Sequence, residues 1–334
     1  MIRVIFIFLT VSVLSACSPG KKDTTYAFYY WQQANSFSDS TSHWIERLNI
    51  SKFYVHIMDV VWSSEKQQPA PTAITALSAS NPITGKSLVP VIFINNEVID
   101  KADTTQLQEL TINLLSAARG FMDKMGSPLA ELQIDCDWTA KTRDKYFLLL
   151  QQLKQLSPGT TYAATIRLYP YKYDRQMGVP PVDYGALMFY NLTSIKNPEE
   201  ENSIFTYKAA SQYRRSNPYP IPLKAILPVF GWYAWFRNND YKGILYESPD
   251  LTGQSFCTRI SKTKFRVLKD TVVNGLYLRN GDILRNEFPD TKDLSAFNKN
   301  LDNLLPGSNE VIFYHWNERF LQHYDTAIKE ITGH

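Results

Sequence analysis

ELQIDCDWT, residues 131–139, places two aspartates inside a short apolar run. Such a run predicts a strand that is buried on both faces, as in a parallel sheet. Side chains two residues apart in a strand share a face, so Asp135 and Asp137 point to the same side. A buried carboxylate is costly unless it is paired or hydrogen-bonded, and two close carboxylates raise each other's pKa. The stretch therefore predicts either a functional pair of acids or structural carboxylates bonded to the backbone and to tyrosine hydroxyls.

Seven further apolar or aromatic runs divide the chain in the same way. The eight runs are YAFYYW (26–31), FYVHIMDVVW (53–62), LVPVIFIN (88–95), LQIDCDW (132–138), YAATIRLY (162–169), ALMFYNL (186–192), AILPVFGW (225–232) and VIFYHW (311–316). Helical patterns separate several of them, at 104–125, 142–156 and 291–305. This alternation of strand and helix predicts an α/β fold, the (β/α)8 TIM barrel. The alternative is an open doubly wound sheet, which the lack of a glycine-rich phosphate loop after the first run disfavours.

One segment interrupts the alternation between the seventh strand and its helix. It is too long for a simple loop, and it contains the strand-like pieces KFRVLKD and GLYLRNGDILRNE,. The second piece includes a turn signal, Arg-Asn-Gly-Asp. We therefore predict a small α+β insertion at about 238–290, beside the barrel mouth.

The N-terminus has the organisation of a secretory signal. Arg3 precedes an apolar run that is too short to span a bilayer as a mature helix,. The run ends in LSAC (14–17), which resembles the lipobox of bacterial lipoproteins, where the cysteine is acylated. We predict a signal peptide at 1–16, a tether at 17–25, the barrel at 26–334, and an extracytoplasmic protein anchored to the envelope membrane by lipid on Cys17. The alternative is an ordinary cleaved signal that contains a cysteine.

Charge and composition exclude some partners. Lysine and arginine total 35 against 32 aspartates and glutamates, a formal net charge of +3, which argues against nucleic acid,. The five histidines show no metal-ligand spacing, so we expect neither a metal nor another cofactor. Cys136 and Cys257 remain after Cys17, and they either form a disulfide or stay as two free thiols.

Three short motifs carry a family resemblance. Asp135-Cys136-Asp137-Trp138-Thr139 resembles the D-x-D-x-E motif on strand four of family 18 glycoside hydrolases, the chitinase-like barrels. Met188-Phe189-Tyr190-Asn191 resembles that family's M-x-Y-D on strand six, and Trp316 matches a tryptophan that ends strand eight. The resemblance implies a hexosamine-containing glycan as the ligand and, in active members, substrate-assisted hydrolysis. In those members the motif glutamate protonates the leaving oxygen and the preceding aspartate orients the N-acetyl group.

The chain departs from this family pattern at the acid itself. Thr139 occupies the glutamate position, and threonine is no general acid near neutral pH. Asn191 replaces the strand-six aspartate, and the first aspartate of the longer family motif falls on Leu132. The family's usual mechanism therefore cannot run here unchanged.

Other acids follow predicted strands and are candidates to replace the missing one. Asp59 ends the second strand, Glu97 follows the third, and Glu318 follows the eighth. Arg167 and Tyr169 end the fifth strand, where an arginine binds an anionic sugar or lowers the pKa of a carboxylate. Each of these residues alone is more often a loop residue than a catalyst. Combined with Asp135 and Asp137, these residues offer an alternative pair of catalytic acids, in which Asp59 or Glu97 is the catalytic partner.

Tryptophans gather at the predicted strand ends. Six of the seven lie there, and we expect five of them to bind substrate: Trp31, Trp62, Trp138, Trp232 and Trp316. Aromatic faces pack on the C–H faces of sugars, and an apolar lining with a few polar groups suits a ligand cleft. The alternative is that these rings plug the barrel top or pack under the insertion. With Tyr190, Asn191, Arg167, Tyr169 and Glu318, they predict a glycan-binding barrel that is either a glycosidase with a displaced acid or a catalytically inactive binding protein.

Overall fold

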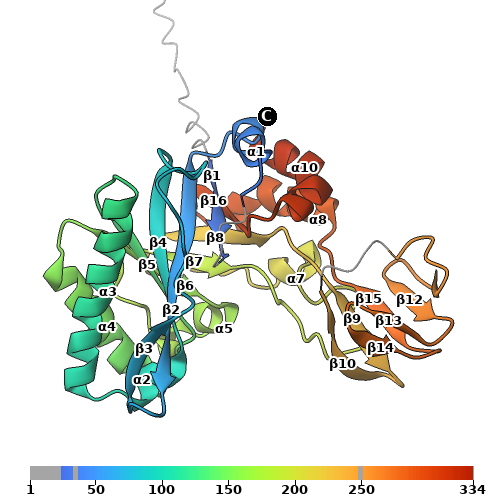
Figure 1. The fold of residues 1–334 in the computed structure, drawn as a ribbon, viewed down its shortest axis with the longest axis horizontal. Coiled ribbons are helices and arrows are strands. Elements are labelled where there is room, and N and C mark those ends of the chain that lie inside the picture. Colours follow the sequence, from blue (N-terminus) through green and yellow to red (C-terminus); the bar gives the residue numbers. More distant parts are fainter. Residues whose placement is uncertain (1–23, 33–36, 247–250, 334) are drawn as a thin grey trace, which may run out of the picture.

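The computed structural model describes residues 24–32, 37–246 and 251–333. Eight parallel strands form a closed barrel, which confirms the predicted fold class (Figure 1). The barrel strands are β1 (Thr25–Tyr30), β2 (Lys52–Ser63), β4 (Ser87–Ile94), β5 (Glu131–Cys136), β6 (Thr161–Ile166), β7 (Tyr184–Met188), β8 (Leu223–Pro228) and β16 (Glu310–Tyr314). They pair in the order β1-β16-β8-β7-β6-β5-β4-β2, and a β1–β2 pairing closes the ring. Cys17 and the predicted signal peptide lie outside the described residues.

Helices cover the barrel and follow most strands. They are α1 (Thr41–Arg47), α2 (Asn96–Lys101), α3 (Thr104–Lys124), α4 (Arg143–Leu156), α5 (Leu168–Lys172), α6 (Asp174–Met177), α7 (Tyr207–Ser211), α8 (Thr291–Lys299), α9 (Leu301–Leu304) and α10 (Glu318–Thr332). The longest, α3, begins with a capping box between Asp103 and Gln106 and buries a leucine face spaced three and four residues apart,. The pattern at 291–305 is split into α8 and α9 at Asn300. No helix in the described ranges has both the length and the apolar character needed to cross a membrane.

Two connections depart from simple alternation. The described residues 64–86 carry β3 (Gln68–Thr72), which pairs antiparallel with the C-terminal half of β2, and no helix. The insertion between β8 and α8 is an antiparallel sheet rather than a mixture of helices and strands in its described residues. Its five main strands are β9 (Tyr233–Arg237), β10 (Asp240–Leu245), β11 (Cys257–Arg259), β12 (Lys264–Val267) and β15 (Ile283–Asn286), in the order β10-β9-β15-β12-β11. A hairpin of β13 (Thr271–Val273) and β14 (Leu276–Leu278) completes it, and Figure 1 shows the sheet standing to one side of the barrel.

The interior of the barrel changes character along its axis. Its middle is filled by apolar side chains that range in size from alanine to tyrosine. Ala27, Tyr29, Val91 and Ala186 are among these buried inward residues. The N-terminal end is closed instead by charged side chains from the first or second residue of four strands. Those residues are Lys52, Glu131, Lys224 and Glu310.

In this charge network each lysine meets both acids. Lys52 Nζ lies 2.9 Å from Glu131 and 3.5 Å from Glu310. Lys224 Nζ lies 3.3 Å from Glu310 and 3.6 Å from Glu131. Tyr54 donates its hydroxyl proton to Glu310 at 2.5 Å. Burial of four compensating charges makes this end a structural plug, because removing any one would leave an unpaired charge inside the barrel.

Cys136 and Cys257, for which the sequence allowed either a disulfide or two free thiols, are both free. Cys136 faces outward from β5 and Cys257 lies in the insertion, and both are buried. Burial raises the pKa of each thiol, so neither is an activated nucleophile,.

Candidate active site

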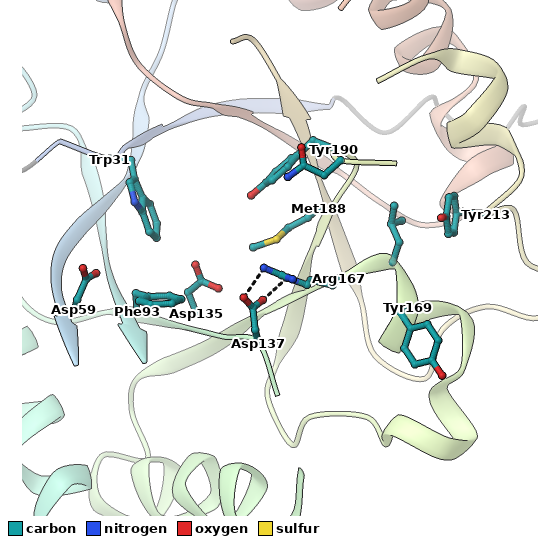
Figure 2. Close-up of a pocket in the computed structure, with 12 residues that line it drawn as sticks. Trp31, Asp59, Phe93, Asp135, Asp137, Arg167, Tyr169, Met188, Tyr190 and Tyr213 are labelled. Atoms are coloured by element: carbon teal, nitrogen blue, oxygen red, sulfur yellow. Dashed lines mark hydrogen bonds and ion pairs between the residues drawn. The ribbon is translucent and has the colours of Figure 1, made fainter. Parts of the chain in front are cut away.

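A cavity of about 510 Å³ opens at the C-terminal ends of the strands, the end of a TIM barrel where active sites lie. Figure 2 shows acids and aromatic rings from several strands around it. The predicted site residues that line it are Trp31, Asp59, Asp135, Asp137, Arg167, Tyr169, Tyr190 and Asn191. The remaining lining residues are Phe93, Leu168, Met188 and Tyr213. We call this space the mouth cavity.

Asp135 lies at the floor of the mouth cavity. It is only 6% exposed, and it accepts a hydrogen bond of 2.5 Å from the hydroxyl of Thr165 on the adjacent strand β6. Burial raises the pKa of Asp135 to about 7; the Thr165 bond opposes the rise, and the negative charge of Asp137 adds to it. A carboxyl group with this pKa is partly protonated at neutral pH, as a general acid must be.

Asp137 lies one step nearer to solvent and is held by Arg167. The two side chains form a bidentate ion pair through Nε and a terminal guanidinium nitrogen. Burial raises the pKa of the Asp137 carboxyl, whereas the charge and hydrogen bonds of Arg167 act to lower it. The guanidinium is well exposed, so the same group is able to bind an incoming polar ligand,. Figure 2 shows Phe93 and Asp135 between this pair and Asp59.

A histidine that sequence reasoning missed supports Asp59. His56 Nε2 lies 2.7 Å from Asp59 Oδ1, and the His56 ring packs on Trp31 with centroids 4.5 Å apart. His56 is 2% exposed, whereas the Asp59 carboxylate opens into the mouth cavity. The histidines lack metal-ligand spacing in the sequence, but such spacing does not indicate whether a histidine forms a hydrogen bond to an acid.

Aromatic rings form the rest of the lining. Trp31 and Phe93 flank Asp59 and Asp135, and Tyr190 stacks on Tyr314 with centroids 5.2 Å apart. Tyr169 is exposed at the rim. Flat apolar faces beside carboxylates suit a sugar, which presents C–H faces and hydroxyl edges at once.

Four of the predicted tryptophans lie outside the mouth cavity. Trp138 is buried against Tyr146, with centroids 5.5 Å apart, and donates its indole N–H to Met177. Trp316 is 1% exposed, in edge contact with Phe28 and Phe53 in the core. Trp62 packs against the core beside Lys101, and Trp232 packs between Phe230 and the insertion residue Tyr246. Trp138 and Trp316 therefore pack in the core, as the alternative reading of the strand-end tryptophans expects.

Two predicted acids also lie elsewhere. Glu97 is in α2, half-exposed, and pairs with Lys101 at 2.7 Å. Glu318 begins α10 and accepts hydrogen bonds from Ser38 and Ser40 at 2.5 and 2.6 Å. Burial raises the pKa of Glu318, but these hydroxyl bonds outweigh it and lower the pKa below its usual value. Glu97 and Glu318 are thus bound to their own surroundings and are absent from the mouth-cavity lining.

Thr139 lies beyond the end of β5 and is exposed. Its backbone N–H donates to the hydroxyl of Thr142 at 2.9 Å, and that hydroxyl donates to Asn96 at 2.6 Å. The position that the family resemblance assigned to a glutamate is therefore outside the mouth cavity. The last side chain of ELQIDCDWT that lines the cavity is Asp137.

Within the parts of the chain that the structure describes, no group of three or more histidine, cysteine, aspartate or glutamate side chains is arranged to hold a metal ion. The chemistry available is that of three carboxyl groups, one guanidinium, one amide and a set of aromatic rings.

Solved structures share this architecture. The Bacillus cereus spore cortex-lytic enzyme SleL superposes with a TM-score of 0.61 and 16% identity, over 93% of this chain and 75% of that one. This chain shares its TIM-barrel fold. Chitinase ChiA74 from Bacillus thuringiensis superposes with a TM-score of 0.51 and 10% identity, over 93% and 70% of the two chains. Identities this low carry the fold alone. A scan of family models and a search of curated proteins find no match.

Proposed function

We propose that this protein binds a hexosamine-containing glycan in the mouth cavity and hydrolyses a glycosidic bond there. The observation that carries the proposal is Asp135, a buried carboxyl with a pKa of about 7 on the floor of an aromatic-lined cavity. Support for the substrate class comes from the resemblance in the Asp135 and Tyr190 motifs. The names of two proteins with the same fold, a spore cortex-lytic enzyme and a chitinase, agree with it.

The proposed chemistry assigns different roles to the two neighbouring acids. Asp135 protonates the leaving oxygen, because burial keeps its proton available near neutral pH,. Asp137 and Arg167 together hold sugar hydroxyls, since a bidentate ion pair presents both donors and acceptors,. Trp31 and Tyr190 supply ring faces for the apolar side of the sugar.

We further propose that the protein works outside the cytoplasm, attached to the bacterial envelope membrane through lipid on Cys17. The support is the signal-like segment 1–16, which ends directly before Cys17, and the polar tether that follows,. An anchor of this kind keeps a hydrolase or binding protein beside envelope glycans.

A second candidate function is glycan binding without hydrolysis. The specific observation in its favour is the Arg167 ion pair, which occupies Asp137, while the glutamate position of the family motif is the exposed Thr139. In this case Asp135 would be a buried neutral acid that donates a hydrogen bond to bound sugar.

Activity and binding assays distinguish the two candidate functions, and both use full-length protein in a non-glycosidic detergent. It is assayed on para-nitrophenyl glycosides of N-acetylglucosamine and of its dimer, on chitin oligosaccharides and on peptidoglycan fragments. Binding of the same sugars is measured by calorimetry. Hydrolysis supports the enzyme, and binding without hydrolysis supports the second candidate. The absence of both hydrolysis and binding would refute the glycan proposal.

Variants then test the acid. Asp135→Asn should lower kcat/KM on the order of 100- to 10,000-fold for oligosaccharides, whose leaving groups need a proton, and much less for nitrophenyl glycosides. Asp144→Asn is the matched control, since Asp144 lies on the exposed face of α4 and pairs with Arg143. Equal losses on both substrate types would remove Asp135 from the role of proton donor.

A further inference from the structure

A β-bulge in β2 determines which side chains reach the mouth cavity from this strand. His56 pairs in register with Val91 of β4, but Met58 pairs with Ile92 and Asp59 with Phe93. Ile57 is therefore the extra residue. In a regular strand, residues three apart point to opposite faces, so His56 and Asp59 would be separated by the sheet. The bulge turns both toward the barrel interior, which is how bulges beside active sites redirect side chains.

The two redirected side chains form a hydrogen-bonded pair. His56 Nε2 lies 2.7 Å from Asp59 Oδ1, while His56 Nδ1 is buried and has no hydrogen-bond partner. A carboxylate only accepts hydrogen bonds, so Nε2 is the donor in this pair. His56 thus donates to Asp59 and fixes its carboxylate, and the stacked Trp31 ring fixes the histidine.

Sheet register places Asp59 level with Asp135, two strands away along the barrel wall. Asp59 is level with Phe93 on β4, and Phe93 is level with Asp135 on β5. Two strand spacings separate the Cα atoms by about 10 Å. Both side chains line the same cavity (Figure 2), and the negative charge of Asp59 is among the causes that raise the pKa of Asp135. Acid and base in inverting glycosidases are roughly 6.5–9.5 Å apart, whereas retaining pairs are only about 5 Å apart.

We propose that Asp59 is the general base of an inverting glycoside hydrolysis in which Asp135 is the general acid, and that His56 is the positioning residue for Asp59. This inference rests on the proposed function and specifies its mechanism. It differs from the substrate-assisted mechanism that the family resemblance implies, in which the N-acetyl group of the substrate, and not water, attacks the anomeric carbon first.

The step balances with water as the only co-reactant. Asp59 takes one proton from the water while the water oxygen forms a bond to the anomeric carbon. The glycosidic C–O bond breaks, its electron pair stays on the leaving oxygen, and Asp135 gives that oxygen its proton. Solvent then returns the proton from Asp59 to Asp135.

The stereochemistry of the product tests the inference on the unmodified protein. Proton NMR follows the first anomer released from the para-nitrophenyl glycoside of the N-acetylglucosamine dimer. We expect the anomer opposite to that of the substrate. A product of retained configuration would overturn the inference and leave the proposed function in place, whereas absence of hydrolysis on every substrate would overturn both.

Variants of the pair give an independent test. Asp59→Ala should lower kcat on the order of 100- to 10,000-fold, and added azide should raise the rate, since an anion attacks without a base and yields the inverted glycosyl azide. An azide product of retained configuration, or wild-type kcat in Asp59→Ala, would contradict the role of Asp59.

His56 is tested by removing and then replacing its donor. His56→Phe keeps a ring against Trp31 but loses the N–H, so kcat should fall with little change in KM. His56→Gln should recover part of the lost kcat, because its amide keeps a donor. His43→Gln, on the exposed face of α1, is the matched control and should behave as wild type. Equal kcat values for His56→Phe and His56→Gln would mean that the hydrogen bond to Asp59 does not position the base.

Discussion

Asp135→Asn should stabilise the fold, and the gain should depend on pH. The folded pKa is about 7 against an ordinary value of 3.8. Below about pH 4 the acid is protonated in both the folded and the unfolded chain, so it adds no pH dependence. Between pH 4 and 7 the unfolded chain releases this proton while the folded chain keeps it, so the wild type loses stability as pH rises. Asparagine cannot ionise and escapes that loss.

The magnitude follows from the two pKa values. Each unit of difference corresponds to about 1.4 kcal/mol, so the wild type carries a cost of about 4 kcal/mol above pH 7 that the variant lacks. Asp135 is only 6% exposed, so solvent screens little of this cost. The hydrogen bond from Thr165 survives the substitution, because the asparagine side-chain oxygen still accepts it. The variant should therefore match wild type near pH 4 and exceed it most at pH 8.

Urea unfolding at pH 4, 5.5, 7 and 8 measures this difference, provided that both proteins have the same m-value. Asp183→Asn is a control of opposite sign. Burial raises the pKa of Asp183, but bonds from Lys154 and the Tyr162 N–H outweigh it and lower the pKa. That variant should lose stability at neutral pH and lose less of it in acid. A difference between Asp135→Asn and wild type that does not grow with pH, or a variant less stable at pH 8, would mean that Asp135 is an ionised structural partner.

Three further changes test other parts of the molecule. Cys17→Ser should abolish incorporation of labelled fatty acid and processing of the signal, and normal labelling would refute the lipobox interpretation. Thr139→Glu should leave hydrolysis unchanged on all the glycosides above, because the new carboxylate lies outside the mouth cavity; a gain of activity would show that this segment closes over the substrate. Glu310→Gln should cost on the order of 3 kcal/mol in urea unfolding, because it leaves Lys52 and Lys224 with one acid between them,. An unchanged unfolding midpoint would mean that the network at the barrel base contributes nothing to stability.

The local sequence pattern alone was enough to predict the barrel and the position of Asp135 and Asp137 on one face of a strand. Each of the eight apolar runs overlaps one barrel strand, because a strand buried on both faces needs apolar side chains on both,. The same alternation placed Asp135 and Asp137 on one face of β5, and both line the mouth cavity. Applied one residue further, it would have turned Trp138 outward with Cys136, where the structure has it. The prediction for Trp138 is wrong because it rests on the position of this residue at a strand end and ignores which face of the strand the side chain occupies.

Tertiary structure decided the partners of those acids. The bulge at Ile57 brings His56 and Asp59 to the same face, and nothing in FYVHIMDVVW marks it, since the bulge depends on how β2 pairs with β4. Asp59 lies within β2, whereas Glu97 follows a strand, lies in the first turn of α2 and pairs with Lys101. Alternation is a property of one strand and is written in its sequence. The residues that face one another across a closed barrel are set by register between strands, which depends on distant parts of the chain.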